Sequence, residues 1–483
     1  MGIIIKNTIK SSIANYIGVV LGIISVLYLQ TWILSPGEIG KIQLIIDKIF
    51  LFSPFILFGT LNAFPRFSHL FDNKKNYSNF VSWSLFLPLI TTTLSCIIFY
   101  FYKVDKEHIY VFFAILFLSL YIRIIENILT TKAKIVYPTI LRAIIFRIMM
   151  ISLLTLLYFN LFDFNGFIMA FAGIHCIHLL LLLPYFIKNT SFQFRLDFSF
   201  FKHPSFKSIL TYCGYSILGT GTGILITKLD SVMIKGILGD YSLVGIYAIA
   251  ASISMLIDMP RRPISQLSIS ILSQNLHENN LSEVKNIYNK SAINLFIVGG
   301  IMFILIWINI DSIFLIMNNG EKYSSGKLVV LFLGLAKVVD MGFGLNSEII
   351  SSSKFYKWNI FIMPFLAVIS ISLNLIFIPQ YAIVGSALAT LISVFTYNVL
   401  RAIIVYKKLN IHSFSTKFIY VGILISLPIM VAHFVPLLSN AYLDIVINSG
   451  LVLILTILPI YFFRLSNEIN GIVNKVLKMI NLK

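Results

Sequence analysis

Long apolar runs alternate with short polar segments along almost the whole chain. A helix needs about 20 apolar residues to cross the hydrocarbon core of a bilayer, and runs of that length recur fourteen times. We predict spans at 11–34, 41–62, 80–101, 109–129, 142–161, 164–187, 208–234, 241–260, 291–310, 327–350, 358–378, 381–406, 417–438 and 442–463. The pattern predicts an all-α integral membrane protein with about 14 transmembrane helices.

The composition supports this class. Hydrophobic residues make up 58% of the 483 residues and charged residues only 12%, against roughly 25% charged in a typical soluble domain. Soluble catalytic domains, nucleic-acid-binding modules and disordered chains are therefore excluded. The first apolar run is longer than a signal-peptide core and lacks an A-x-A-like cleavage site, so we expect it to be retained as the first span.

The basic residues predict the orientation. An even number of spans places both termini on one side, and cytoplasmic loops carry an excess of Lys and Arg. With both termini in the cytoplasm, the inside segments hold 28 of the 37 basic residues and the outside loops six, while Lys48, Lys228 and Lys337 fall within spans. The net charge of +18 therefore indicates membrane topology rather than nucleic-acid binding.

The longest polar segments suggest how the chain is divided. Residues 188–207 separate the sixth span from the seventh, so we predict an N-terminal six-helix bundle (1–187), a cytoplasmic linker (188–207), a C-terminal six-helix bundle (208–410) and two extra helices with a cytoplasmic tail (411–483). LSPGEIGKIQLI from Leu34 and LGDYSLVGIYAI from Leu238 follow the first and seventh spans. They are consistent with a parallel internal repeat, although chance similarity between two short glycine-containing turns explains them equally well.

The sequence gives little support for an enzymatic function. The chain contains no HExxH, GxSxG, phosphate-binding loop or paired-cysteine motif. His175 and His178 are the only close histidine pair, and without carboxylate or cysteine support this spacing is more often polar packing than a metal site or proton relay. We therefore expect no enzymatic activity, no cofactor and no bound metal.

Charged residues deep in spans are more informative, because a charge at the bilayer centre costs at least about 2.5 kcal/mol. Asp47 and Lys48 lie in the second span, and Lys41 shares the helix face of Lys48. They form either a basic stripe for an anionic ligand or a local ion pair with a neighbouring span. Lys228 and Asp230 in the seventh span are two residues apart, so at least one must find its partner elsewhere.

The tenth span carries a stripe of polar positions. Lys337, Asp340, Gly344 and Glu348 follow at steps of three, four and four, so they share one helix face. In one interpretation Lys337 and Asp340 neutralise each other. In the other, the stripe lines a hydrated path in which the carboxylates take up protons or cations.

Arginines gather at the predicted inner ends of two other spans. Arg261 and Arg262 follow Asp258 at the end of the eighth span, and Arg142 and Arg147 lie at the start of the fifth. They act either as cytoplasmic anchors or, through bidentate donors, as sites that attract a phosphate.

Three segments resemble a known family. NYIGVVLGII from Asn15, followed by LSPGEIGKIQLI and FPRF, resembles the opening of polysaccharide-biosynthesis exporters. KLDSVMIKGILGDYSLVGIYAIA from Lys228 and SLNLIFIPQYAIVGSALATLIS from Ser372 resemble signatures of the family's seventh-to-eighth and eleventh-to-twelfth spans. Where the last signature usually has Tyr-Gly, this chain has Tyr381-Ala382.

The family is that of the Wzx-type flippases of the multidrug/oligosaccharidyl-lipid/polysaccharide superfamily. The resemblance implies a V of two six-helix bundles with two further C-terminal helices, in the cytoplasmic (inner) membrane of a bacterium. It implies that an undecaprenyl-diphosphate-linked oligosaccharide is turned from the cytoplasmic to the outer leaflet, for O-antigen, lipopolysaccharide, capsule or exopolysaccharide synthesis. Partner proteins would be a polymerase and other glycan-assembly proteins, with H⁺ or Na⁺ as the coupling ion.

The function implied by this resemblance suggests roles for the charged residues within the spans. A diphosphate head group cannot cross hydrocarbon unaided, so basic side chains in a hydrated cavity would shield it. The substrate-binding candidates are Lys48, Lys228, Lys337, Arg147, Arg261 and Arg262, and the ion-coupling candidates are Asp47, Asp230, Asp340 and Glu348. The alternatives are an ion-coupled exporter of small molecules and, less favoured because no large outside loop is predicted, a membrane glycan polymerase or ligase.

Overall fold

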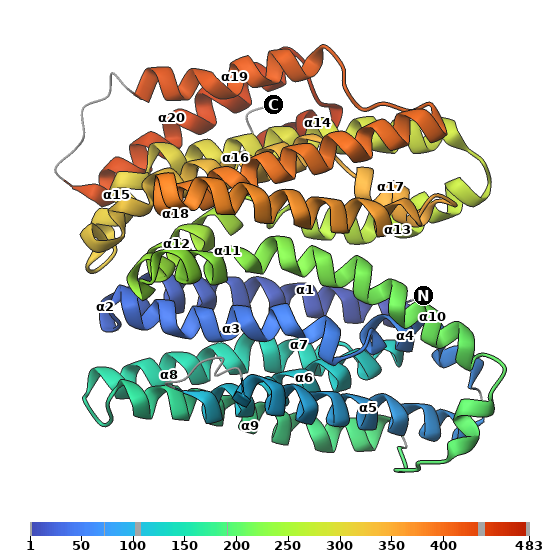
Figure 1. The fold of residues 1–483 in the computed structure, drawn as a ribbon. Coiled ribbons are helices and arrows are strands. Elements are labelled where there is room, and N and C mark those ends of the chain that lie inside the picture. Colours follow the sequence, from blue (N-terminus) through green and yellow to red (C-terminus); the bar gives the residue numbers. More distant parts are fainter. Residues whose placement is uncertain (1, 72, 102–107, 191, 433–439, 480–483) are drawn as a thin grey trace. The chain divides into compact units, whose positions relative to one another are not determined.

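The structure is a computed structural model that describes all residues except 1, 72, 102–107, 191, 433–439 and 480–483 (Figure 1). The described chain is helical, with turns and short loops between the helices and no strand, which confirms the predicted fold class. It forms two compact units, Met1–Val232 and Met233–Lys483. Two of the predicted outside lysines, Lys103 and Lys106, and the end of the predicted 417–438 span lie outside the described residues.

The first unit contains eleven α-helices, the last of which runs past its boundary, with short π-helical and 3-10 segments (η) between them. They are α1 (Gly2–Ile23), η1 (Ile24–Gln30), α2 (Thr31–Ile33), α3 (Pro36–Ile56), α4 (Thr60–Phe67), η2 (Ser68–Leu70), α5 (Lys74–Phe101), α6 (Ile109–Thr131), α7 (Val136–Ile140), η3 (Leu141–Ile145), α8 (Phe146–Tyr158), α9 (Phe164–Thr190), η4 (Phe198–Lys202), α10 (Phe206–Ser216), η5 (Ile217–Gly221) and α11 (Thr222–Leu238). In Figure 1 α5, α6 and α9 lie side by side.

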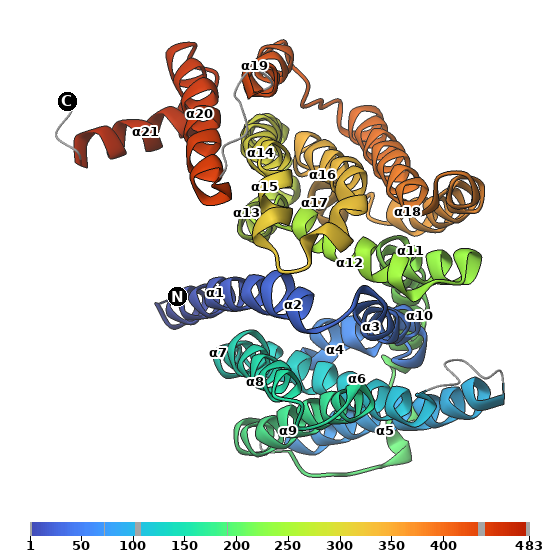
Figure 2. The same ribbon diagram turned by 90° about the vertical axis from the view of Figure 1, so that its left-hand side faces the viewer.

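The second unit continues with ten α-helices in the described residues. They are α12 (Tyr241–Met255), α13 (Arg261–His277), α14 (Leu281–Ile308), α15 (Ile310–Ile316), η6 (Gly320–Gly326), α16 (Lys327–Gly342), α17 (Asn346–Ser352), α18 (Trp358–Leu409), α19 (Lys417–Ala432), α20 (Ala441–Phe462) and α21 (Asn467–Met479). Figure 2 shows α19 and α20 beside α14.

The helices account for every predicted span. Among the described residues, nine helices are long and apolar enough to cross a membrane alone, and two bent pairs raise the number to eleven. Two shorter apolar helices, Tyr241–Met255 and Lys417–Val431, coincide with the predicted spans 241–260 and 417–438. The 49-residue segment Phe361–Leu409 covers the two predicted spans 358–378 and 381–406. The structure is therefore consistent with about 14 spans.

The two repeat-like motifs both begin a helix. The Ser35 hydroxyl accepts a hydrogen bond from the Glu38 backbone N–H, and the Glu38 carboxylate accepts one from the backbone N–H of Ser35, which is a complete capping box for α3. The Asp240 carboxylate caps α12 by accepting from the Ser242 N–H at 2.7 Å. Equivalent turns thus end in equivalent helix starts after the first and seventh spans.

Three membrane helices of the first unit contain a π-helical segment, at 24–30, 141–145 and 217–221. Such segments are rare and concentrate at functional sites. The third follows α10 and leads directly into α11, which carries Lys228 and Asp230. Two glycines lie in this segment: a β-carbon on Gly221 would lie 3.4 Å from Pro54 of α3, whereas one on Gly219 would meet nothing within 4 Å.

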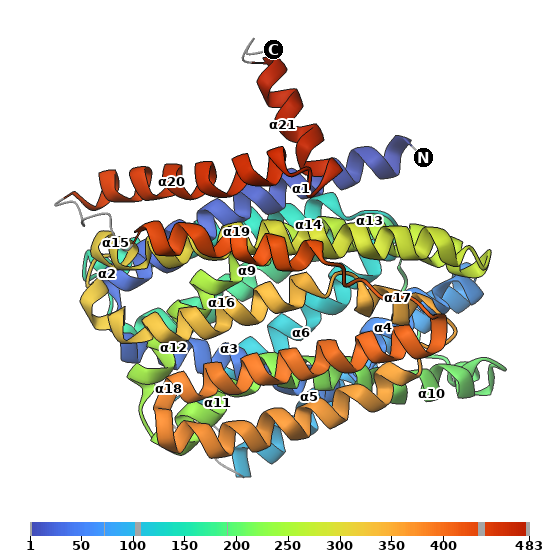
Figure 3. The same ribbon diagram turned by 90° about the horizontal axis from the view of Figure 1, so that it is seen from above.

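α18 is a hairpin rather than one long helix. The Ser386 hydroxyl donates to Asn374 Oδ1 at 2.8 Å, although twelve residues of straight helix would separate the two by about 18 Å. Nearer the helix ends, Arg401 Nη2 donates to Asn359 Oδ1 at 3.3 Å. The chain reverses at Ala382, whose φ of 50° and ψ of −130° are not helical. The two arms are therefore antiparallel and lie side by side (Figure 3).

Ala382 occupies a backbone conformation that favours glycine. Such a conformation costs a residue with a β-carbon about 1–3 kcal/mol, and glycine adopts it freely. We therefore expect Ala382→Gly to stabilise the protein by about 1 kcal/mol and to raise the midpoint of thermal unfolding in detergent. Ala389, fully buried in the second arm, provides the matched control, because Ala389→Gly is expected to destabilise by about 1 kcal/mol. A lower midpoint for Ala382→Gly would contradict the assigned turn.

The predicted linker 188–207 is docked against α5. The Asn79 side chain donates to the Asp197 carbonyl and accepts from the Asp197 N–H, both at 2.9 Å, and Trp83 Nε1 donates to the same carbonyl at 3.1 Å. The boundary between the compact units lies later, within α11. This segment is thus part of the first unit, and its role as a connector between two bundles stays a prediction.

Candidate functional site

An ion pair joins the second and seventh spans inside the first unit. Lys228 Nζ on α11 donates to Asp47 Oδ1 on α3 at 2.8 Å, and Gln43 Nε2 donates to the same oxygen at 2.9 Å. The Asp47 side chain is 3% exposed and that of Lys228 29%. The sequence left two interpretations of Asp47 and Lys48, a basic stripe or an ion pair with a neighbouring span. For Asp47 the structure shows the ion pair. The expectation that Lys228 or Asp230 pairs elsewhere is confirmed.

Two further candidates are close in sequence to this ion pair, and neither side chain is exposed. Lys48 is half-buried on α3, and Asp230 is 5% exposed on α11. Both interact with other groups of the chain. Their substrate-binding and ion-coupling roles stay predictions.

Two arginines and a glutamate line a polar cavity of about 280 Å³ in the first unit. Arg123 and Glu126 lie on α6, and Arg142 lies on η3. Arg142 Nη1 contacts Glu126 Oε2 at 3.2 Å, while Arg123 Nη1 donates to Ser53 Oγ at 3.2 Å and its guanidinium stacks 3.9 Å from the centre of the Phe50 ring. We call this site the arginine cavity.

Glu126, a lining residue of the arginine cavity, also approaches a buried histidine that does not line it. His178 Nε2 on α9 lies 3.9 Å from Glu126 Oε1, beyond hydrogen-bonding distance. Neither atom has a hydrogen-bond partner among the described residues. The position of His178 beside a buried carboxylate is consistent with polar packing between helices, the role that the sequence favours over a metal site or proton relay.

Sequence reasoning did not identify the arginine cavity. In the sequence, Arg123 contributes only to the basic residues of a predicted inside segment, whereas Arg142 is either an anchor or a site that attracts a phosphate, and no pattern connects the two. The spacing of Arg123 and Glu126 at i and i+3, just before the predicted end of a span, was the available signal. Arg147, a predicted candidate, packs elsewhere: its guanidinium carbon lies 3.6 Å from the position that a β-carbon would take on Gly22 of α1.

In the second unit, Arg261 connects both sides of a broken helix. α16 and α17 are bent by 51° relative to each other, and Gly344 in the break has a φ of +65°. Arg261 Nη1 contacts Asp340 Oδ2 on α16, and Nη2 lies 3.6 Å from Glu348 Oε1 on α17 and donates to the Gly344 carbonyl at 3.4 Å. One guanidinium therefore contacts two carboxylates and a backbone carbonyl in the helix break.

Further side chains complete this Arg261 network. Asn398 Nδ2 on α18 donates to Asp340 Oδ1 at 3.0 Å, and the Ser265 hydroxyl donates to Glu348 Oε1 at 2.5 Å. The side chains of Arg261, Asp340 and Glu348 are only 10–20% exposed. The network thus joins α13, α16, α17 and α18 through largely buried polar contacts.

The Arg261 network corrects one reading of the tenth span. The pairing considered between Lys337 and Asp340 does not form, because the carboxylate of Asp340 contacts Arg261 and Asn398. Lys337 interacts electrostatically with Asp258 instead. The helix break also interrupts the continuous stripe, although Asp340 and Glu348 still converge on one arginine. Arg262, next to Arg261, is exposed.

A second arginine lies deeper in the same unit. Arg401 on α18 is 2% exposed, and its guanidinium lies 3.7 Å from the centre of the Tyr397 ring. It interacts electrostatically with Asp340 and Glu348. It lies near the inner end of the predicted span 381–406, where an arginine usually serves as an anchor.

Comparisons with known proteins show the fold. A structure of the lipid II flippase MurJ in an inward-closed conformation matches 94% of this chain and 99% of its own, with 14% identity and a TM-score of 0.69. An inward-facing multidrug resistance MATE family transporter of the MOP superfamily matches 80% of this chain and 94% of its own, with 16% identity and a TM-score of 0.63. An outward-facing structure described in the same way matches 84% and 96%, with 16% identity and a TM-score of 0.57. No family model and no curated protein matches by sequence. The chain therefore has the fold that these transporters share.

Proposed function

We propose that this chain is a transporter that turns an undecaprenyl-diphosphate-linked oligosaccharide from the cytoplasmic to the outer leaflet by alternating access. The fold similarity to a lipid II flippase over nearly the full length of both chains supports a lipid-linked glycan as the substrate class. The sequence signatures support the Wzx-type branch, with O-antigen, capsule or a related glycan as the product and a polymerase as a partner. The expected location is the bacterial inner membrane, with both termini in the cytoplasm.

The arginine cavity is the observation that carries this proposal. Arginine matches phosphate and carboxylate groups with paired donors, and two arginines line one polar cavity within otherwise apolar helices. A membrane protein that only needed stability would gain little from such a site, because charges are costly in the bilayer. A cargo with an anionic head group gives the two arginines a function.

Depletion of the protein in its host tests the proposal. We expect a lipid-linked oligosaccharide to accumulate in the cytoplasmic leaflet, measured by comparing its accessibility to a membrane-impermeant oxidant in inverted and right-side-out vesicles. The accumulated lipid would also identify the sugar. Normal levels and normal distribution of every lipid-linked saccharide in depleted cells would refute the flippase assignment.

A small-molecule exporter is the second candidate. The fold similarity to MATE family transporters supports it, as do the buried carboxylates Asp47 and Asp340, which suit a cationic cargo. This candidate predicts that depletion increases sensitivity to cationic drugs without any change in lipid-linked saccharides. The two assays together separate the candidates.

We propose that H⁺ or Na⁺ drives the cycle through Asp340 and Glu348. Both carboxylates share Arg261, so a proton taken up by either would weaken its hold on that side of the helix break. Transport by vesicles containing the purified protein is then expected to need a pH or Na⁺ gradient. Equal rates with and without both gradients would exclude coupling.

Lys337→Ala is expected to reduce export by at least about tenfold, equivalent to roughly 1.4 kcal/mol, while membrane insertion stays normal. Lys337 is half-buried within a span and faces Asp258, and Lys337→Arg should restore part of the activity if charge is what matters. Lys327→Ala is the control, because Lys327 begins the same helix and pairs with the exposed Asp311 at 2.6 Å. Full export by Lys337→Ala would assign Lys337 a structural role only.

A further inference from the structure

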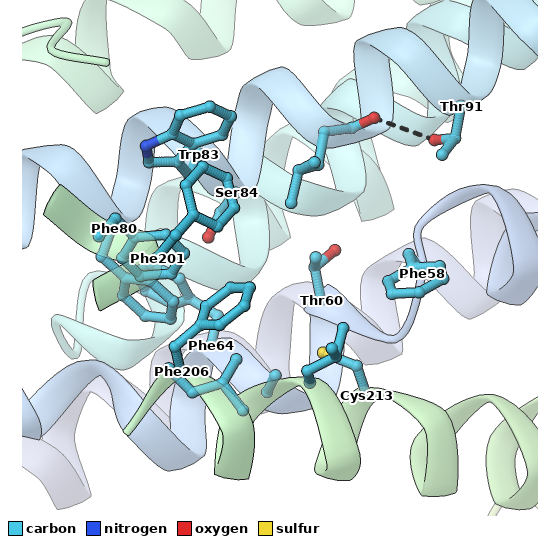
Figure 4. A pocket seen from close by; sticks show the side chains of 15 residues that line it. Phe58, Thr60, Phe64, Phe80, Trp83, Ser84, Thr91, Phe201, Phe206 and Cys213 are labelled. Atoms are coloured by element: carbon cyan, nitrogen blue, oxygen red, sulfur yellow. Dashed lines mark hydrogen bonds between the residues drawn. The ribbon is translucent and has the colours of Figure 1, made fainter. Parts of the chain in front are cut away.

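A second cavity, of about 310 Å³, lies in the first unit between α4, α5, α10 and the docked segment that contains η4 (Figure 4). Aromatic rings form much of its wall. Phe64 and Phe80 stack with ring centres 5.0 Å apart, and Phe201 packs edge-on against Trp83 at 4.6 Å. No charged side chain lines it. We call this cavity the aromatic slot.

The aromatic slot is elongated along the membrane-spanning direction of α5. Phe80, Trp83, Leu87 and Thr91 all line it, and this spacing places them on one helix face. Eleven residues of helix separate the first from the last, which is about 16 Å. The third predicted span begins at residue 80, so the slot runs from the membrane boundary into the bilayer. This is the shape of an extended hydrocarbon chain.

The few polar groups in the wall are already satisfied. The Thr91 hydroxyl donates to the Ile56 carbonyl at 2.5 Å and lies 3.1 Å from the Leu87 carbonyl, the contact drawn in Figure 4. The Thr60 hydroxyl donates to the Leu57 carbonyl at 2.6 Å. Trp83 Nε1 is engaged by the Asp197 carbonyl. The slot thus offers an occupant apolar contacts and almost no hydrogen bonds, so water is a poor occupant.

Basic residues surround the shallow end of the slot. Lys202 and Lys207 are exposed and adjoin the lining residues Phe201 and Phe206 in sequence. Arg66, also exposed, lies with its guanidinium carbon 4.6 Å from the centre of the Tyr212 ring, next to the lining residue Cys213. Basic clusters at the cytoplasmic boundary of a membrane protein attract anionic lipid head groups.

We propose that the aromatic slot binds one acyl chain of an anionic phospholipid from the cytoplasmic leaflet, with the head group at Arg66, Lys202 and Lys207. The occupant is a bound lipid and not the transported cargo, so this inference does not depend on the proposed function. The lipid fills the space beneath the docked segment and fastens that segment to α5 and α10. It thereby supplements the hydrogen bonds of Asp197.

Trp83 provides a direct reporter of occupancy. The chain has four tryptophans, and replacement of Trp32, Trp307 and Trp358 by Phe leaves Trp83 alone. Its side chain is 5% exposed, so an acyl chain brominated near its middle quenches its fluorescence only from within the slot. The full chain is reconstituted in phosphatidylethanolamine vesicles that contain an equal minor fraction of brominated phosphatidylglycerol or brominated phosphatidylethanolamine.

We expect brominated phosphatidylglycerol to quench Trp83 at a mole fraction at least about fivefold lower than brominated phosphatidylethanolamine, because each basic residue at the surface strengthens anionic-lipid binding by about that factor. A variant with Trp32 as the only tryptophan is the matched control. Trp32 is 41% exposed and should be quenched equally by both lipids.

Two sets of variants test the two ends of the slot. Ser84→Phe fills the slot and should abolish quenching of Trp83, while Lys202→Ser with Lys207→Ser should lower the preference for phosphatidylglycerol by roughly fivefold for each lysine. Lys285→Ser with Lys407→Ser, two exposed lysines of the second unit, should change nothing.

Three results would overturn the proposal. The first is that neither brominated lipid quenches the fluorescence of Trp83. The second is that both brominated lipids quench it equally. The third is loss of quenching when unlabelled undecaprenyl phosphate is added at the concentration of the phospholipid probe, which would identify the cargo's own chain as the occupant. The lysine variants alter only exposed side chains, so a folding defect in Ser84→Phe leaves the test of the head-group end intact.

Discussion

Export by Arg261→Gln is expected to fall to the level of depleted cells, and the purified variant is expected to unfold at a lower temperature. Arg261 is the shared partner of Asp340 and Glu348 and a donor to the Gly344 carbonyl. Its removal takes away the only cation within 4 Å of these two carboxylates among the described residues, and leaves the more distant Arg401 as their remaining arginine partner. Breaking a buried ion pair by removing one partner typically costs about 3–5 kcal/mol, which is a large share of the stability of most proteins.

Arg262→Gln is the control for this experiment. Arg262 adjoins Arg261 at the start of the same helix and is exposed, so the same loss of charge should leave the unfolding temperature nearly unchanged. A fall in export without a change in stability would support its predicted role as a substrate-binding residue. Arg261→Lys should recover only part of both, because an ammonium group lacks the planar fork that contacts two carboxylates and a carbonyl at once. Wild-type export by Arg261→Gln would show that the network is dispensable.

The second large effect is expected at the ion pair between α3 and α11. Lys228→Met leaves the 3%-exposed Asp47 carboxylate with Gln43 as its remaining described hydrogen-bond donor. We expect a loss of roughly 3–5 kcal/mol in unfolding free energy and little export. Asp47→Asn should cost less, because a neutral amide can keep the contact with Gln43 and its partner Lys228 is partly exposed.

The double variant Lys228→Met with Asp47→Leu separates stability from function. Replacing both members of a buried ion pair by apolar residues is often neutral or stabilising, so its unfolding temperature should return to near that of the wild type. Export should stay low if either charge acts on the cargo or the coupling ion. Recovery of both properties would show that the pair serves stability alone.

The spans could be predicted from sequence because the bilayer imposes them. Each helix must be long and apolar enough to satisfy its backbone within hydrocarbon, and each predicted run is mostly helical in the part that the structure describes. The orientation within the membrane is predicted by the charge of the loops alone. The tight reversal at Ala382 was visible only as a two-residue gap between predicted spans and as an alanine where similar sequences have glycine.

The partners of the charged residues could not be predicted in the same way. Asp47 and Lys228 are 181 residues apart in the chain, and no local pattern specifies which helices pack together. Arg261 and Arg123 lie near the inner ends of predicted spans, where the positive-inside rule already explains an arginine. The helix break at Gly344 redirects the stripe of the tenth span, so a periodicity that assumes one straight helix pairs Asp340 with the wrong neighbour.

The reversal within α18 also bears on how the chain is made. Its two arms are joined by a tight turn without a loop. Two hydrogen bonds connect the arms: one between Ser386 and Asn374 near the turn, and one between Arg401 and Asn359 near the helix ends. Neither arm satisfies these polar groups alone, and an unpaired polar group in hydrocarbon is unfavourable. The two arms are therefore expected to leave the insertion machinery together as a pre-paired hairpin, and a glycosylation or epitope tag inserted at Ala382 would block biogenesis rather than report topology.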